Sequence, residues 1–379
     1  MKSLGLYLHI PFCRSKCLYC DFCSFPHPDP ARMRAYTDAL CRELILRAPD
    51  CKDHTVDTVY LGGGTPTVLP IDCLERILNT VFFHYRISKD AECTAECNPA
   101  TADRALLSRL YSLSINRLSL GVQSVHVGEL RALGRLHTLS DVEKTVDDAR
   151  QVGFQNLSFD VMFGIPQQTE QSYLGTLDTL CALSPTHLSA YGLTVEEGTP
   201  FGKKQREGRL LLPDEEEVER MYFSGRDYLA RQGYAHYEIS NFAKEGYESR
   251  HNLKYWNCDE YLGFGVAAYS DFSGARFGNS RDAIAYIEGR EILEELETVS
   301  LEERKNEYVM LRMRLARGIS AADFESRFNE PLERRFGASL RRYIEGGFVR
   351  RTENGYAFTP KGWYVSNAIL SEILDFSSK

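Results

Sequence analysis

Three cysteines close to the amino terminus constrain this chain more than any other feature of its sequence. They are spaced Cys13-x-x-x-Cys17-x-x-Cys20 and follow an apolar run, residues 4–10, that predicts a buried strand ended by Pro11. Protein iron–sulfur clusters normally take four thiolates, so three on one short loop would leave one iron free for a non-protein ligand. The spacing therefore favours a redox-active cluster with an open coordination position.

Other interpretations of this loop stay open on the residues alone. Zinc sites also use cysteines, but they usually combine two C-x-x-C-like pairs, and no second pair stands at a convincing spacing. Clustered cysteines can also be small buried hydrophobes. Disulfides are disfavoured because the chain has 11 cysteines, an odd number, and no secretory signal. Zinc is therefore the main alternative to the cluster.

Up to about residue 195, short apolar segments alternate with amphipathic ones. This alternation predicts a parallel sheet with helices outside, and a site at the carboxyl ends of the strands. The expected strands are Leu4–Ile10, Thr58–Leu61, Glu92–Glu96, Arg117–Leu120, Ser158–Phe163 and His187–Tyr191. The expected helices are Met33–Leu46, Leu74–Phe83, Ala102–Leu110, Asp141–Val152 and Ser172–Leu183.

The remaining sequence suggests a division of the chain into residues 1–212, 213–299 and 300–379. Residues 196–212 contain several glycines and a proline, which indicates a connector. Residues 234–290 are weakly periodic, so we expect irregular structure with short strands. From residue 300 helices return, with a hairpin about Asn354-Gly355 and a helix from Pro360, an order typical of a winged helix.

Composition and charge exclude several classes of protein. No run approaches the roughly 18 apolar residues that a membrane helix needs. The net charge of −8 argues against nonspecific binding of nucleic acid, and residues 301–379 carry only 14 Lys and Arg against 11 Asp and Glu. We therefore expect a cytoplasmic protein with no integral membrane segment and no nucleic-acid partner.

The stretch Tyr7-Leu-His-Ile-Pro-Phe-Cys13-Arg-Ser-Lys-Cys17-Leu-Tyr-Cys20-Asp-Phe22 resembles the opening of radical S-adenosylmethionine (SAM) enzymes. It is similar to the branch that contains oxygen-independent coproporphyrinogen III oxidase and the heme chaperone HemW. The resemblance implies an α/β fold, a partial (β/α)6 barrel with a small, mostly helical, winged-helix-like C-terminal domain. It also implies a [4Fe-4S] cluster on the three cysteines, whose fourth iron takes the amino and carboxylate groups of SAM and whose reduction releases a deoxyadenosyl radical.

A glycine-rich segment, Gly62-Gly-Gly-Thr-Pro-Thr67, directly follows the second expected strand. Consecutive glycines let the backbone approach a ligand and leave amides free for its oxygens. The segment resembles the superfamily motif that contacts the amino group of SAM. Acidic side chains suit ribose hydroxyls and the sulfonium charge, and an arginine suits the cofactor carboxylate. By this resemblance the SAM-binding positions are Tyr7, Tyr19, Gly63, Gly64, Thr65, Glu96, Gln123, Arg135 and Asp160.

Three features favour the chaperone branch over the oxidase. Phe22 stands where the oxidase has a fourth cysteine, and the oxidase's amino-terminal extension ahead of Tyr7 is missing. The segment His251-Asn-Leu-Lys-Tyr-Trp256 resembles a HemW motif implicated in heme handling, which makes His251 a candidate heme ligand. The alternative for His251 is a hydrogen-bonded place in an aromatic cluster. Tyr269 departs from the family, because many HemW members have histidine there.

The resemblance implies a HemW-like heme chaperone that binds a [4Fe-4S] cluster, SAM and heme as cargo. Its implied partners are heme or another tetrapyrrole, an acceptor hemoprotein, and an electron donor such as a flavodoxin or ferredoxin. No catalytic residue is assigned. The alternatives are the radical SAM oxidation of coproporphyrinogen III in porphyrin biosynthesis, and a different radical SAM reaction on another tetrapyrrole.

Overall fold

A sheet of twelve strands forms the centre of the computed structural model, which describes residues 1–290 and 293–374. Six of its strands form a consecutive parallel series, in which each strand after the first pairs with the one before it in the series. They are β1 Lys2–Ile10, β4 His54–Gly63, β5 Ile87–Cys97, β6 Arg117–Gln123, β7 Asn156–Phe163 and β8 His187–Gly192. The expected partial (β/α)6 barrel is confirmed, and every predicted strand lies within one of these six.

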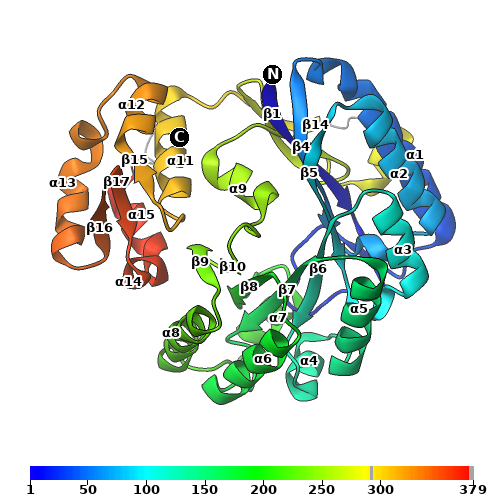
Figure 1. Cartoon of the computed structure of the whole chain (residues 1–379), viewed down its shortest axis with the longest axis horizontal. Helices are drawn as coiled ribbons and strands as arrows, with labels where there is room; N and C mark the ends of the chain where they lie inside the picture. The colour runs from blue at the N-terminus through cyan, green and yellow to red at the C-terminus, as the bar shows by residue number, and fades with distance from the viewer. Residues whose placement is uncertain (291–292, 375–379) are drawn as a thin grey trace.

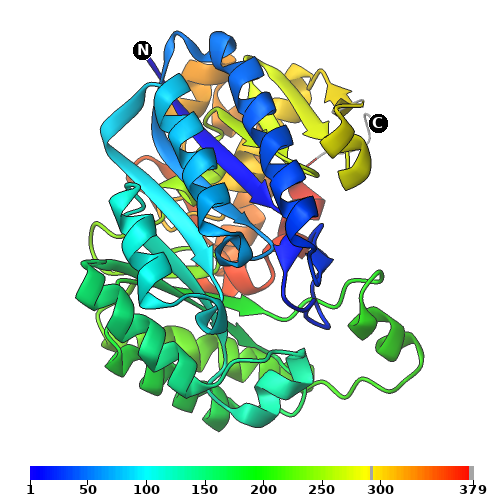
Figure 2. The ribbon, with the colours of Figure 1, turned by 90° about the vertical axis from the view of Figure 1, so that its right-hand side faces the viewer.

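Helices cover the outer face of the parallel strands (Figure 2). They are α1 Pro30–Arg47, α2 Ile71–His84, α3 Arg104–Ser112, α4 Val127–Leu133, α5 Leu139–Val152 and α6 Glu170–Ala182. Most of these helices, but not α2 or α4, begin at a side chain that accepts first-turn amides, and Thr138 and Thr169 both form capping boxes. The sequence did not predict α4, because seven residues give too little periodicity to recognise.

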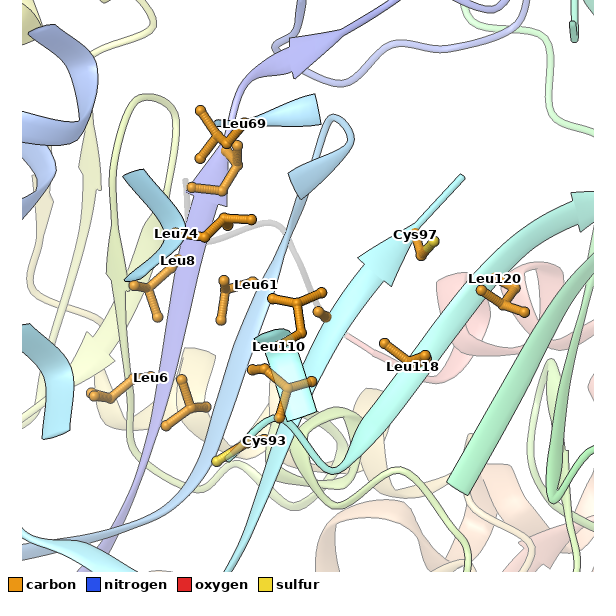
Figure 3. Packing of buried hydrophobic residues seen from close by; sticks show 14 of the residues in the cluster. Leu6, Leu8, Leu61, Leu69, Leu74, Cys93, Cys97, Leu110, Leu118 and Leu120 are labelled. Atoms are coloured by element: carbon orange, nitrogen blue, oxygen red, sulfur yellow. The ribbon is translucent and has the colours of Figure 1, made fainter. Parts of the chain in front are cut away.

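The helices and the outer face of the sheet share one hydrophobic core (Figure 3). Because side chains alternate along a strand, Leu6, Leu8 and Leu61 point outward toward the helices, and so do Cys93 and Cys97. These two cysteines therefore belong to the core. The intervening residues of each strand point into the barrel lumen, and many of them are polar.

Residues 213–299 add strands to both edges of the barrel sheet. β10 Asn241–Ala243 and β9 Ala235–Glu238 extend it beyond β8. On the other edge, β11 Tyr261–Phe264 pairs with β1 in parallel, and β12 Tyr269–Phe272, β13 Ala275–Asn279 and β14 Leu293–Glu297 follow. The short strands expected over residues 234–290 are therefore present.

Four further helices lie between the end of β8 and residue 299. They are α7 Pro200–Arg206, α8 Glu215–Arg231, α9 Arg250–Asn257 and α10 Ala283–Glu288. α7 corrects the expectation of a plain connector over residues 196–212, because Thr199 caps a short helix there. α9 corrects the expectation of irregular structure over residues 234–290, and it lies between the barrel and the C-terminal part of the chain (Figure 1).

Residues from 301 onward pack around a second hydrophobic core (Figure 1). The elements are α11 Leu301–Arg312, β15 Ile319–Ser320, α12 Ala321–Phe328, α13 Leu332–Glu345, β16 Val349–Thr352, β17 Gly355–Phe358, α14 Pro360–Tyr364 and α15 Ser366–Ile373. The winged-helix order is confirmed, with the hairpin turn at residues 353–354, one position earlier than expected. No helix within the described ranges has the length and apolar character needed to cross a membrane.

One buried carboxylate, Glu43 of α1, ties the added strands to the barrel. Glu43 is 2% exposed. It accepts hydrogen bonds from the Gly265 amide at 2.9 Å, from Asn279 Nδ2 at 2.8 Å and from the Tyr286 hydroxyl at 2.6 Å. Three donors that follow β11 in the chain therefore depend on one side chain of α1.

Replacing Glu43 by alanine would leave the Gly265 amide and the Tyr286 hydroxyl without an acceptor, and Asn279 Nδ2 would keep only the Gly265 carbonyl. We expect the free energy of unfolding in chemical denaturation to fall by about 3 kcal/mol. Glu143→Ala, at an exposed position of α5, is the matched control and should change it by less than about 0.5 kcal/mol. Equal stability of the two variants would contradict this role of Glu43.

Candidate cofactor-binding site

A cavity of about 900 Å³ opens at the carboxyl ends of the barrel strands. Its lining includes the three cysteines predicted to bind a cluster and every residue predicted to bind SAM. These residues are Tyr7, Cys13, Cys17, Tyr19, Cys20, Gly63, Gly64, Thr65, Glu96, Gln123, Arg135 and Asp160. His251, the predicted heme ligand, does not line the cavity. The structure thus brings together residues that lie up to 153 positions apart in the sequence.

The cysteine loop, residues 11–26, is fastened by its backbone to elements that the sequence did not reveal. Leu18 donates its amide to the Leu133 carbonyl at the end of α4 and accepts from the Phe201 amide of α7, both at 3.0 Å. The three side chains also pack together. At the base of the loop, β2 Phe12–Cys13 pairs with β3 Phe25–Pro26. The loop therefore holds its shape through contacts with α4 and α7.

The three thiols are half-buried on the cavity wall. Burial raises the pKa of Cys13 and of Cys20, so a bound cation is needed to hold them as thiolates at neutral pH. Arg135 Nη1 donates to Cys17 Sγ at 3.5 Å. In the described part of the chain, no three His, Cys, Asp or Glu side chains converge closely enough to hold a single metal ion. The donor set fits a group with several metal atoms, each bound by one thiolate.

The glycine-rich segment packs directly against the cysteine loop. Gly63 has φ of 107°, and a Cβ at Gly64 would lie 2.7 Å from the Phe12 carbonyl oxygen. The amides of Gly63, Gly64 and Thr65 are all occupied, which corrects the expectation that they are free for a ligand. The Gly64 amide donates to Ile10 at 2.9 Å and that of Thr65 to Phe12 at 2.7 Å. Gly63 donates its amide to Glu96 Oε2 at 3.1 Å.

Two carboxylates face each other inside the cavity. Glu96 accepts a hydrogen bond from the Tyr60 hydroxyl at 2.9 Å, and Asp160 accepts one from Ser119 Oγ at 3.2 Å. Burial and then the charge of Asp160 raise the pKa of Glu96 to about 7, and burial also raises the pKa of Asp160. Together with Arg135, these groups suit a ligand that carries both a positive charge and a carboxylate.

The remaining predicted residues complete the walls of the cavity. Gln123 ends β6 with φ of 67°, a left-handed conformation that is uncommon for residues other than glycine and is often found at functional sites. The Tyr7 hydroxyl is paired with His9 Nδ1 at 3.0 Å, and its ring stacks on Tyr60 with centroids 6.1 Å apart. Burial raises the pKa of Tyr19, so its hydroxyl stays protonated beside the cysteine loop.

His251 lies on α9, behind the cavity wall, and is 1% exposed. Its Nδ1 is paired with Thr58 Oγ1 and its Nε2 with the Tyr255 hydroxyl, both at 2.8 Å. Burial lowers the pKa of His251 to about 3, so the ring is neutral at physiological pH. Neither nitrogen is free for iron in this conformation. Tyr255 and Tyr269 do line the cavity.

The family assignment follows from comparison with known proteins. Residues 7–180 match the model of the radical SAM superfamily, and residues 299–365 match that of the HemN C-terminal domain. The heme chaperone HemW of Bacillus subtilis (strain 168) is 34% identical, and the match covers 99% of both chains. The chain belongs to the HemW family. The heme chaperone HemW of Escherichia coli (strain K12) is 31% identical, also over 99% of both chains.

A solved structure shows the same fold as this HemW-family chain. Coproporphyrinogen III oxidase (HemN) from Escherichia coli, a radical SAM enzyme, matches with a TM-score of 0.87. The match covers 99% of this chain and 91% of that one at 22% sequence identity, so it shows the fold alone. The predicted resemblance to the radical SAM superfamily and to HemW is confirmed.

Sequence reasoning missed several residues that line the cavity of this HemW-family chain. They lie on predicted strands, and they are Tyr60, Arg117, Ser119, Ser189 and Tyr191. The alternation of side chains along a strand is the signal that could have found them, since positions two apart share a face.

The pKa of about 7 for Glu96 predicts that SAM binding by this chain depends on pH. The ionised carboxylate accepts hydrogen bonds and faces a cation better than the protonated acid does, so SAM affinity should fall up to about tenfold per pH unit below about pH 7. Glu96→Gln should abolish this slope. Equilibrium dialysis of anaerobically reconstituted protein at several pH values measures the SAM affinity. A slope that persists in the variant would contradict the assignment of this pH dependence to Glu96.

The same group predicts a trend in the stability of the unliganded protein. Folding raises the pKa of Glu96 from 4.5 to about 7, so between these values the folded state binds more protons than the unfolded state. The contribution of Glu96 to the free energy of unfolding therefore falls as pH rises through that window. Urea titrations give the difference in the free energy of unfolding between Glu96→Gln and wild type. This difference should favour the variant more at about pH 8 than at about pH 5. The opposite order would contradict the raised pKa.

Proposed function

We propose that this HemW-family chain is a heme chaperone that binds heme and passes it to an acceptor hemoprotein. The observation that carries the proposal is the match along 99% of both chains to the heme chaperone HemW of Bacillus subtilis. A likeness confined to the barrel would support only a shared cofactor. Because the match extends through the C-terminal part, it supports a shared function of the whole chain.

Cys13, Cys17 and Cys20 would hold a [4Fe-4S] cluster, and SAM would bind beside it. When bound, such a cluster supplies an electron to SAM, and a donor such as a flavodoxin or ferredoxin would replenish it. The chain's own part is to position the cofactor and exclude water. Arg135, beside the Cys17 thiol, suits the carboxylate of SAM, and the buried Glu96 suits its ribose or sulfonium group.

Heme would find flat apolar surface and iron ligands on the same side of the barrel. The rings of Tyr7 and Tyr60 stack, and Tyr255 closes the wall beside them. Tyr269, 44% exposed at the cavity, can offer a phenolate to ferric heme. His251 becomes available only if its hydrogen bond with Tyr255 breaks. We therefore propose that His251 ligates heme after the Tyr255 side chain moves aside.

Coproporphyrinogen III oxidation is the second candidate function, favoured by the fold shared with HemN at a TM-score of 0.87. The two functions differ in what the reconstituted protein does under anaerobic conditions. As a chaperone, it should give a saturable Soret band with heme and leave coproporphyrinogen unchanged. Protoporphyrinogen formation with stoichiometric deoxyadenosine would overturn the chaperone proposal, as would the lack of a saturable heme band.

A pair of variants tests the ligand. His251→Ala should weaken heme binding in Soret titrations at least tenfold and leave the visible absorbance of the cluster intact, because His251 lies outside the cysteine loop. Tyr255→Phe removes the hydroxyl that occupies Nε2, so it should bind heme at least as tightly as wild type. Unchanged affinity in His251→Ala, or the same loss in both variants, would contradict ligation by His251.

A further inference from the structure

Arg117, the first residue of β6, places a buried positive charge in the barrel lumen. Its side chain is the largest of the fully buried ones, with 2% exposure, and it lines the cavity. Its Nε has no hydrogen-bond partner. Across the described residues, the guanidinium forms neither a hydrogen bond nor an ion pair. The charge thus lines the cavity without a partner among the described side chains.

An unpaired arginine in this position is costly. Its guanidinium stays charged at any physiological pH, and a buried charge is tolerated only when it is paired. The nearby carboxylates do not pair with it, since Glu96 accepts from Tyr60 and Gly63 and Asp160 accepts from Ser119. A bound anion would complete the site with two parallel hydrogen bonds.

Two buried histidines that sense this charge, His187 and His251, offer it no hydrogen-bond acceptor either. His187 is paired with Ser158 at Nδ1 and with Tyr237 at Nε2, and His251 has both nitrogens occupied. Burial is the main cause that lowers the pKa of both rings, with a smaller contribution from the charge of Arg117, so both are neutral. The charge of Arg117 also favours the ionised forms of Glu96 and Asp160, but among the described residues neither carboxylate forms an ion pair with the guanidinium.

The carboxylate of SAM has a different place. Arg135, which suits that carboxylate, touches the Cys17 thiol and the carbonyl of Gly121 at the cluster end of the cavity. Gly121 lies four residues along β6 from Arg117, a separation of about 13 Å between their Cα atoms at the usual strand rise. One carboxylate held beside Cys17 does not also neutralise Arg117, so the lumen provides for a second anionic group.

We propose that Arg117 forms a second carboxylate-binding subsite in the lumen, and that it takes a propionate of a tetrapyrrole. The inference rests on the proposed heme function. A tetrapyrrole carries flat apolar faces and carboxylates on one edge, and the lumen offers the rings of Tyr7, Tyr60 and Tyr255 near a buried guanidinium. Ser119 and Ser189 line the same cavity and hydrogen-bond Asp160, which leaves the guanidinium as the group that would receive the propionate.

The test compares heme with its dimethyl ester, which keeps the macrocycle and iron but has no free propionate. Wild-type protein should bind heme at least tenfold more tightly than the ester in Soret titrations. Arg117→Met should lose that preference, because its affinity for heme falls while its affinity for the ester does not. Arg117→Lys should retain part of the preference. SAM affinity, from equilibrium dialysis of the reconstituted protein, should stay unchanged. Arg131→Met, at an exposed position of α4, is the matched control.

Each contrary outcome has its own meaning. If wild-type protein binds the ester as tightly as heme, the inference is overturned even if Arg117→Met fails to fold. If Arg117→Met lowers the affinity for SAM and not the affinity for heme, the carboxylate that Arg117 binds belongs to SAM and the inference is wrong. Equal weakening of heme and ester would mean a structural role for Arg117. A wild-type protein with no saturable heme band would instead remove the proposed function on which the inference rests.

Discussion

The close approach of two backbones, the cysteine loop and the end of β4, is the constraint on which the rest of the site depends. Gly64 and Thr65 donate their amides to Ile10 and Phe12, and a side chain at Gly64 would collide with the Phe12 carbonyl. On its other side the loop is fastened through Leu18 to α4 and α7. These bonds fix where the three thiols can lie.

The barrel keeps apolar and charged groups on opposite faces of the same strands. Leucines on the outer face build the core with the helices, while Glu96, Asp160 and Arg117 point into the lumen. Low polarity around these three groups strengthens their interactions with any charged ligand and raises the pKa of both carboxylates. The lumen is therefore suited to bind ligands that carry both positive and negative charges. Arg135 lies beside the cysteine loop, and Arg117 lies deeper in the lumen.

Much of the fold and site was predictable, because both follow local rules. The alternation of apolar and amphipathic segments predicted the six parallel strands of the barrel. The polar residues at the strand ends predicted part of the cavity lining. The helices α4, α7 and α9 were not predictable, because each is only seven or eight residues long. The pairing of β11 with β1 joins residues more than 250 positions apart, and no local pattern reports it. His251 and Tyr255 stand four apart, so their contact was predictable once α9 was known.

The central claim is that three thiolates hold a cluster with one iron open to SAM. Mössbauer spectroscopy of protein reconstituted anaerobically with isotopically enriched iron and sulfide tests it most directly. We expect a [4Fe-4S] spectrum in which one iron site shifts when SAM is added and the other three do not. A spectrum that is insensitive to SAM, or a protein that holds zinc instead of iron and sulfide, would contradict the account.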